Sequence, residues 1–309
     1  RSFTGAQAGI LTDNQYEKAR IVHIDEAPLR QALADDCIPV VAGFQGINYT
    51  GDITTLGRGG SDTTAVALAA CLSADECQIF TDVDGVYTAD PRIEPGARLL
   101  KTMTPEEMLE LSSLGSKVLQ VRSVEFAKKY HVPLRVLSSF KPNPGTKICH
   151  GDTVDNSDTS TEDAEQKHLE NPVISGITYS RQEAKLTLAH VPDAPGTVAE
   201  LLAAVSQHEI EIDMIVQHTH EPGKADFTFT VHRDDYTKTM QILDKVISNL
   251  SPAIQLTGNN RMAKLSLVGV GMRNHASVTQ KMFQALASEK IHIFLTATSE
   301  IKISVMIDE

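Results

Sequence analysis

The stretch "TTLGRGGSD" (residues 54–62) stands directly before "TTAVALAACLSA" (63–74), which has one of the clearest helix patterns in the chain. Glycine tolerates backbone torsions and close approaches that other residues forbid, so a glycine-rich turn lets the main chain come within hydrogen-bonding distance of a ligand. The first N–H groups of the following helix, with its positive dipole end, favour an anion. The glycines concerned are Gly57, Gly59 and Gly60.

Three side chains of the same stretch suit an anion site. Arg58 offers a planar guanidinium that pairs with a carboxylate or a phosphate. Ser61 or Asp62 is expected to cap the helix. The spacing is neither GxxxxGK[ST] nor GxGxxG, so it predicts neither a Walker loop nor a Rossmann fingerprint. From spacing alone, the stretch is either an anion site at the end of a parallel strand or only a tight turn.

Around this turn the chain alternates between strand and helix patterns, which indicates an α/β fold with a parallel sheet. "IPVVAGF" (38–44) is expected to be a buried parallel strand. In "TPEEMLEL" (104–111), Thr104 is expected to cap a helix and Glu107 to complete a capping box. The other expected strands are "ARIVHID" (19–25), "CQIFTDV" (77–83) and "PLRVLSS" (133–139), and the other expected helices cover 26–36, the residues from Thr63, and about 117–130.

The segment "TDVDGVYTADPR" (81–92) is a second candidate site. It leaves the end of a predicted strand and carries acids, a tyrosine and an arginine on a loop with glycine and proline. Open α/β sheets place ligands on loops at the carboxyl ends of strands, and this mixture suits a nucleotide with its metal. The same residues are also compatible with a solvated loop of Asx turns. Lys117 would act at such a site only if the fold brought it to the phosphates.

The second half of the chain repeats itself after an acidic linker without apolar periodicity, "GDTVDNSDTSTEDAEQKHLEN" (151–171). Residues 184–215 and 263–295 share a strand, a turn, an amphipathic helix and a strand in the same order. With the elements between them, including a turn at Pro222 and Gly223, the first copy reads βαββαβ, a ferredoxin-like plan. The expected domains are therefore 1–150, 172–258 and an incomplete 259–309.

Composition excludes several classes of protein. With 28 basic and 40 acidic residues the formal net charge is −12, which argues against nucleic-acid binding. No apolar run reaches the length of a membrane span and no signal-peptide pattern opens the chain, so a cytoplasmic location is expected. The 4 cysteines form no CxxC pair and are expected to be reduced. His218 and His220 lack a third ligand, so no metal site of the protein itself is expected.

Several long motifs in the right order resemble one family almost from end to end. They are "VVAGFQGINYTGDITTLGRGGSDTTAVALAA", "TDVDGVYTADPR", "EEMLELSSLGSKVL", "RSVEFAKKYHVPLRVLSS" and the duplicated tail. These look like the aspartate kinases of the amino-acid-kinase superfamily, which carry two ACT domains. The resemblance implies a partial amino-acid-kinase αβα sandwich followed by two ferredoxin-like ACT domains.

The resemblance also implies an activity and the residues that perform it. Aspartate kinases transfer the γ-phosphoryl group of ATP, bound with Mg²⁺, to the β-carboxylate of L-aspartate, the first step toward lysine, threonine, methionine and diaminopimelate. By matching motifs, Arg58 would clamp a substrate carboxylate, Phe44 and Ser61 would line the aspartate pocket, and Asp62 would orient substrate and a catalytic lysine. The nucleotide would be bound by Thr81, Asp82, Tyr87 and Arg92, with Lys117 near its phosphates.

ACT pairs in this family bind lysine or threonine, or both, between units and inhibit the kinase, and they imply a homo- or hetero-oligomer. The matching effector positions are Asp193, Gly196, Asp213, Gln217, Ser299 and Glu300. Where related chains often show "HPGV" in the second unit, this chain has "HASV" (275–278), which leaves the effector's identity open.

The family's Lys-Phe-Gly-Gly-Thr-Ser motif is not found in this sequence. We therefore expect a fragment of a longer enzyme, truncated at both ends, with little or no kinase activity of its own. Two alternatives remain from the sequence: a regulatory subunit that only binds effectors, and another amino-acid kinase acting on glutamate, acetylglutamate or a nucleoside monophosphate. The tandem ACT units and "TTLGRGGSD" favour aspartate.

Overall fold

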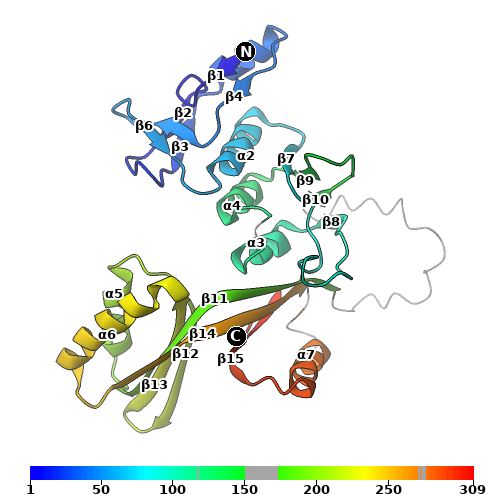
Figure 1. Cartoon of the computed structure of the whole chain (residues 1–309). Coiled ribbons are helices and arrows are strands. Elements are labelled where there is room, and N and C mark those ends of the chain that lie inside the picture. Colours follow the sequence, from blue (N-terminus) through cyan, green and yellow to red (C-terminus); the bar gives the residue numbers. More distant parts are fainter. Residues whose placement is uncertain (117, 150–172, 271, 273–275) are drawn as a thin grey trace. The chain divides into compact units, whose positions relative to one another are not determined.

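The computed structural model describes residues 1–116, 118–149, 173–270, 272 and 276–309. It divides into two compact units (Figure 1). The first contains Arg1–Thr178 with Val268–Val270, and the second contains Tyr179–Leu267 with Gly271–Glu309. The expected linker at 151–171 and the candidate Lys117 lie outside the described residues.

From Arg1 to Cys149, the described residues of the first unit form three sheets and four helices. The sheets have the strand orders β1-β4, β3-β2-β5-β6 and β7-β9-β10-β8. The strands are β1 (Ser2–Phe3), β2 (Ile10–Thr12), β3 (Ile21–Ile24), β4 (Val40–Val41), β5 (Gln45–Ile47), β6 (Ile53–Thr55), β7 (Cys77–Thr81), β8 (Thr102–Met103), β9 (Leu134–Ser138) and β10 (Thr146–Ile148). The helices are α1 (Ala27–Ala34), α2 (Gly60–Leu72), α3 (Pro105–Ser113) and α4 (Val121–Tyr130).

Helices α2, α4 and α3 lie in a row against the sheet β7-β9-β10-β8 (Figure 1). Their apolar faces and the alternate buried residues of β7 and β9 form one core, which includes Met108, Val124 and Val136. Strands β7 and β9 are parallel, as expected for an α/β unit. The capping box of α3 is confirmed, because Thr104 accepts from the Glu107 backbone while Glu107 reaches back to the Thr104 backbone.

Two expectations for this unit are wrong. The run 38–44 is not a buried strand: only Val40–Val41 is extended, paired with β1, and Ile38 and Val40 are 80% and 61% exposed. β-branched residues favour an extended backbone, but they do not determine what covers it. Helix α2 begins at Gly60 rather than Thr63, because the backbone already turns helical within the glycine-rich stretch.

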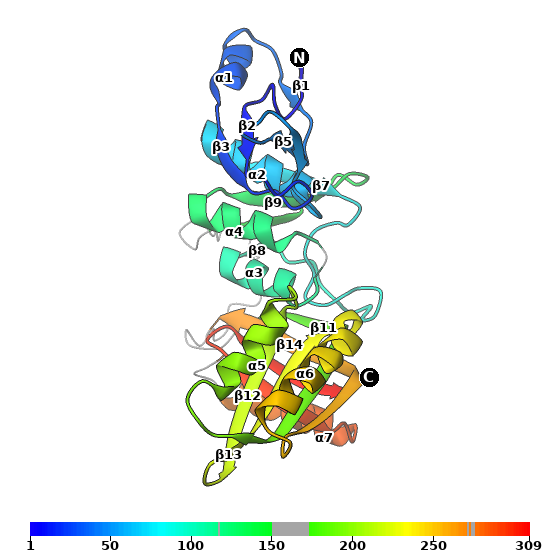
Figure 2. The ribbon, with the colours of Figure 1, turned by 90° about the vertical axis from the view of Figure 1, so that its left-hand side faces the viewer.

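The second unit is built on a six-stranded sheet with the order β12-β13-β11-β14-β16-β15. The first repeat follows the expected βαββαβ plan, and its turn at Pro222 and Gly223 joins two antiparallel strands. Figure 2 shows α5 and α6 lying against the strands of the first repeat. The elements are β11 (Val173–Pro192), α5 (Thr197–Ser206), β12 (Ile212–Glu221), β13 (Lys224–His232), the 3₁₀ turn η3 (Arg233–Asp235), α6 (Tyr236–Leu250), β14 (Gln255–Val270), α7 (Ala276–Ser288), β15 (Ile293–Thr298) and β16 (Lys302–Asp308).

This sheet is strongly curled, so that strands far apart in the ladder touch. Lys185 of β11 lies over the ring of Phe294 of β15, with 4.6 Å from Nζ to the ring centroid. Neighbouring strands are about 4.8 Å apart, so a flat sheet would separate β11 from β15 by about 14 Å. The curl encloses a cluster of Met214, Met262 and Met306. The two repeats also share β14, one continuous strand that contains the expected domain boundary at 258 and 259.

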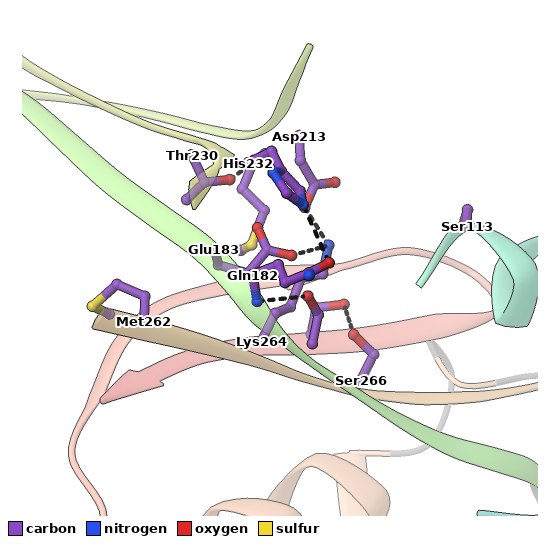
Figure 3. A network of polar contacts seen from close by, with 12 residues as sticks. Ser113, Gln182, Glu183, Asp213, Thr230, His232, Met262, Lys264 and Ser266 are labelled. Carbon is purple, nitrogen blue, oxygen red and sulfur yellow. Dashed lines mark hydrogen bonds and ion pairs between the residues drawn. The ribbon is translucent and has the colours of Figure 1, made fainter. Parts of the chain in front are cut away.

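An ion-pair network centred on the buried Lys264 joins three strands of this sheet (Figure 3). The Lys264 ammonium lies 3.3 Å from Glu183 and 2.5 Å from Asp213, and the Lys264 side chain is 6% exposed. Burial acts to lower the pKa of Lys264, but the charge of Glu183 and the hydrogen bond to Asp213 outweigh it and the pKa is raised. Ser266 and Ser304 share a hydrogen bond of 2.7 Å beside them. The network therefore ties β11, β12 and β14 together.

Candidate functional site

The glycine-rich turn before α2 requires glycine for two separate reasons. Gly57 and Gly59 have φ of 76° and 71°, in the left-handed region that glycine adopts at little cost. A Cβ on Gly59 would lie 1.8 Å from the Cγ atom of Gln120, so that position also has no room for a side chain. The turn is closed by a hydrogen bond of 3.0 Å from the Gly60 amide to the Gly57 carbonyl.

Ser61 and Asp62 lie inside the first turn of α2 and do not cap it, so that expectation is wrong. Gly59 is the capping residue, and it has no side chain to accept from the helix. Ser61 is exposed and Asp62 is half-buried. Burial raises the pKa of Asp62 above its ordinary value, while a backbone hydrogen bond from Gln120 acts in the opposite direction. A desolvated carboxylate in this position is typical of a functional site.

Phe44 reaches the same place through a strained backbone. Its φ is 72°, which is uncommon for a residue with a bulky side chain. Its amide donates to the Thr64 hydroxyl over 3.1 Å, and its carbonyl accepts from the Leu56 amide over 3.0 Å. A Cβ on Gly60 would meet the Phe44 ring at 2.8 Å, so the ring lies over the start of α2. The structure thus brings Phe44 to the residue next to Ser61.

Arg58 is exposed and has no hydrogen-bond or ion-pair partner among the described residues. Its guanidinium therefore projects from the turn with all of its donors available to a ligand. Lys117, which was expected near the nucleotide phosphates, is outside the residues that the structure describes. Gln120, which is described, lies against Gly59.

Sequence reasoning missed two residues that hold this turn. Gln120 is the capping residue of α4 and packs over Gly59. The Arg122 guanidinium donates to the carbonyls of Leu56, over 2.7 Å, and Ala19, over 3.1 Å. Both acceptors are backbone atoms far away in the sequence, so no side-chain pattern could have indicated the contact. Arg122 fastens the residue before the glycine-rich stretch to an earlier loop.

The second candidate site begins where β7 ends. The Thr81 hydroxyl donates to the Asp82 carboxylate over 3.1 Å, and the Tyr87 hydroxyl donates to Asp84 over 3.4 Å. Lys141, which was not expected here, pairs with Asp84 over 2.9 Å. The hydrogen bond from that ammonium is the main reason why the pKa of Asp84 is lowered.

The expected nucleotide residue Arg92 forms a fork on Asp90, with 3.0 Å from Nε and 2.7 Å from Nη2 to the two carboxylate oxygens. This bidentate bond is the main reason why the pKa of Asp90 is lowered. The Arg92 side chain is 85% exposed, so solvent reaches the pair. Among the described residues, no hydrogen bond or ion pair joins this loop to Arg58 or Asp62.

Three of the six expected effector residues line one cavity of about 480 Å³ in the second unit. It lies where β11 ends and α5 begins, and Gly196, with φ of 97°, caps α5 without a side chain. Asp193 accepts from the Thr219 hydroxyl over 3.4 Å. The three residues are Asp193, Gly196 and Gln217, and the apolar part of the lining includes Val191, Pro192 and Val198.

The other three effector residues lie elsewhere. Asp213 pairs with Lys264 and is not part of the cavity lining. Ser299 and Glu300 form the turn between β15 and β16, where the Ser299 hydroxyl accepts from the Lys302 amide over 3.2 Å. Within the described chain, the cavity is therefore lined by three of the six expected residues and not by the other three.

Three family models match the chain. The amino acid kinase family matches residues 1–138, and two ACT domain models match residues 186–248 and 265–309. No helix of the described residues combines the length and apolar character needed to span a membrane.

Curated relatives match over the whole length of the chain. The aspartokinase of Pseudomonas aeruginosa is 55% identical over 308 residues, covering 100% of this chain and 72% of the relative. The aspartokinase of Corynebacterium glutamicum is 46% identical over 319 residues, covering 100% of this chain and 71% of the relative. The chain therefore spans rather more than two thirds of these relatives.

Solved structures share the fold. The aspartate kinase of Clostridium acetobutylicum superposes with a TM-score of 0.76 at 22% identity, covering 100% of this chain and 67% of that one. The structure of aspartokinase III from Escherichia coli in complex with lysine and aspartate superposes with a TM-score of 0.69 at 26% identity, covering 99% of this chain and 65% of that one.

Proposed function

The chain belongs to the aspartokinase family of kinases, and from that premise we propose that its first unit binds L-aspartate and ATP for transfer of the γ-phosphoryl group to the β-carboxylate. The observation that supports this most directly is the turn before α2. There Arg58 has no described partner, the first turn carries a desolvated Asp62, and Phe44 closes over Gly60. A guanidinium and helix amides suit the carboxylates of aspartate.

The reaction needs positioning and charge neutralisation and no proton transfer. A β-carboxylate oxygen of aspartate attacks the γ-phosphorus, the bond to the bridging β–γ oxygen breaks, and ADP leaves with that bond's electron pair. In the proposed roles, Arg58 holds a substrate carboxylate, Phe44 and Ser61 line the pocket, and Asp62 orients the substrate. Lys117 would neutralise charge on the phosphates.

The donor set at the end of β7 fits a nucleotide with Mg²⁺. That ion keeps several waters and takes one or two carboxylates besides the phosphates, so it needs no cage of protein ligands. The Asp82 side chain is exposed and accepts from Thr81, which leaves carboxylate lone pairs for the ion. When bound, the ion would offset the negative charge of the phosphates. Thr81, Tyr87 and Arg92 would contact the nucleotide itself.

The cavity of the second unit is the proposed site of feedback regulation by lysine or threonine. Asp193 supplies a carboxylate for an α-ammonium group, and the amides at the start of α5 suit an α-carboxylate. Gln217 adds a neutral donor and acceptor. The related E. coli enzyme has been captured with lysine and aspartate, which supports an amino acid as the ligand class. Assembly of chains through the ACT units would complete the set with Asp213, Ser299 and Glu300.

Calorimetry with L-aspartate tests the substrate assignment on the 309-residue chain. We expect binding by the natural sequence and at least a tenfold loss for Arg58→Ala, about the value of one charge-assisted bidentate pair. Arg92→Ala is the matched control, because its partner is Asp90 and its proposed ligand is the nucleotide. Equal aspartate affinity in the Arg58→Ala and natural chains would contradict the assignment. A coupled ADP-release assay is expected to show little turnover, since the sequence holds no Lys-Phe-Gly-Gly-Thr-Ser motif.

The second candidate function is that of a regulatory subunit that binds an effector and catalyses nothing. The cavity lined by Asp193, Gly196 and Gln217 favours it. Titration with aspartate and ADP, beside titration with lysine and threonine, separates the two functions: a chain that binds an effector but neither aspartate nor ADP is a regulatory subunit.

A further inference from the structure

The loop that follows β7, residues 82–100, is here called the nucleotide loop. Its outgoing arm, around 86–88, and its returning arm, around 98–100, are joined by backbone hydrogen bonds. The Thr88 amide donates to the Arg98 carbonyl over 2.9 Å, and the Leu100 amide donates to the Val86 carbonyl over 2.8 Å. The Arg98 amide in turn donates to the Thr88 hydroxyl over 3.0 Å. Tyr87 lies between these bonds, so the position of its ring depends on how the two arms are held.

The base of the nucleotide loop is fastened by β10. The Thr146 hydroxyl, fully buried, accepts from the Val86 amide over 2.9 Å and donates to the Leu100 carbonyl over 2.6 Å. These bonds hold the first residues of each arm but do not reach Thr88. The part of the loop beyond Tyr87 therefore needs another support.

That support comes from the beginning of β11. The Ile177 amide donates to the Thr88 carbonyl over 2.8 Å. Gly176 is buried against α3, since a Cβ there would lie 2.9 Å from Leu111 Cδ2 and 3.6 Å from the Thr88 carbonyl oxygen. The Ser175 hydroxyl, 7% exposed, donates to the Glu107 carboxylate. The three consecutive residues 175–177 thus join α3 to the nucleotide loop.

Glu107 is well placed to anchor such a segment. The residue is 6% exposed, and the carboxylate oxygen Oε2 accepts from the Thr104 amide and the Thr104 hydroxyl, each over 2.9 Å. The capping box therefore already fixes the carboxylate before Ser175 adds its bond. Loss of the Ser175 hydroxyl would leave a buried Glu107 oxygen without that hydrogen bond, so the contact stabilises the attachment of residue 175 to α3.

We propose that Ser175, Gly176 and Ile177 are positioning residues for the nucleotide loop: Glu107 and Leu111 hold the segment, and the Ile177 amide holds Thr88 and so the arm that carries Tyr87. None of the three touches the nucleotide in this role. The role in ligand binding rests on the proposed function, whereas the effect on the loop itself does not.

Hydrogen exchange and calorimetry on the 309-residue chain test this proposal. In Ser175→Ala we expect the amides of Ile177, Thr88 and Arg98 to exchange about tenfold faster, the value of one buried bond to a charged group. The Val86 amide is expected to stay protected, because Thr146 holds it. Affinity for ADP should fall about tenfold with no change in affinity for aspartate, a split that general destabilisation would not produce.

Thr104→Ala is the matched control, because it removes the hydroxyl bond to the same Glu107 carboxylate without touching Ser175. It is expected to destabilise α3 but to leave exchange at Thr88 and Arg98 unchanged. Ile177→Pro deletes the N–H that donates to the Thr88 carbonyl and should reproduce the exchange pattern of Ser175→Ala in the loop. Equal exchange in Ser175→Ala and Thr104→Ala, or an unchanged Thr88 amide in both β11 variants, would overturn the proposal. Failure of the natural chain to bind ADP would overturn the proposed function, while the exchange comparison would still decide the role of residues 175–177.

Discussion

Replacing Lys264 by methionine removes the ammonium that two carboxylates share inside the second unit. Methionine follows the path of the lysine stem, so the packing of that stem is retained and the charge is the main change. Because Glu183 and Asp213 lose their common partner, we expect the second unit to be strongly destabilised at neutral pH.

The magnitude follows from how deeply each partner is buried. Breaking a buried ion pair by removing one member costs about 3–5 kcal/mol, because it leaves an uncompensated charge. The Glu183 side chain is 10% exposed and carries most of this cost. The Asp213 side chain is 43% exposed, so its share is about 0–1 kcal/mol. We therefore expect a loss of about 4 kcal/mol for Lys264→Met.

Urea denaturation, with hydrogen exchange of the β11 and β14 amides as the readout, measures this loss in the free energy of unfolding of the second unit. The double variant Lys264→Met with Glu183→Gln is the control, since it removes the unpaired charge and should recover at least half of the loss. Acidification from neutral pH should reduce the difference in unfolding free energy between Lys264→Met and the natural chain, because the unpaired carboxyl becomes protonated. In the natural chain the raised pKa of Lys264 means that the pair's contribution is complete at neutral pH and is lost only as the pH rises past its ordinary value of 10.5. A cost below about 1 kcal/mol, or a double variant no more stable than the single one, would refute this reasoning.

Three further predictions concern the first unit. Gly59→Ala should lower the melting temperature by clearly more than Gly51→Ala. Both glycines have positive φ, so alanine costs about 1–2 kcal/mol at either position, but only at Gly59 would its Cβ also meet Gln120. Adding Gln120→Ala should therefore reduce the difference in melting temperature between the two glycine variants. Asp62→Asn should be at least as stable as the natural chain at neutral pH, because a carboxyl with a raised pKa contributes stability at low pH that is lost as the pH rises; its stability should vary less between pH 4 and 7, and calorimetry should show weaker aspartate binding. Burial raises the pKa of Cys77 to about 11, so mass spectrometry after brief alkylation at pH 8 should find Cys37, which is exposed, labelled well before Cys77; equal labelling would contradict the structure.

Sequence reasoning succeeded where the controlling interaction is local. The capping box of α3 depends on Thr104 and Glu107, three residues apart, and the turn at Pro222 and Gly223 depends on two adjacent residues. Both were predicted, because helix caps and tight turns are determined within a few residues. The glycine-rich turn was likewise recognised, although its helix starts earlier than the apolar pattern suggested.

The contacts that the sequence did not reveal join residues far apart in the chain. Arg122 binds carbonyl groups, which every residue has, so its partners have no sequence signature. Lys264 was overlooked because a lone lysine in a strand is normally solvated, and only the curl of the sheet brings Asp213 and Glu183 to it. The prediction of a buried strand at 38–44 was wrong for the same reason. β-branched residues favour an extended backbone, but they do not specify which part of the chain covers it, and Ile38 is exposed.

Strand β14 has a consequence for recombination. Residues 255–270 form one strand that belongs to both repeats, and methionines from β12, β14 and β16 meet in one cluster. One repeat therefore cannot be replaced without changing a strand and a core that the other repeat also uses. A chimera that joins the first repeat of one relative to the second repeat of another would have to rebuild a shared strand and a common interior at once. Chimeras that fold should therefore take both repeats from the same relative.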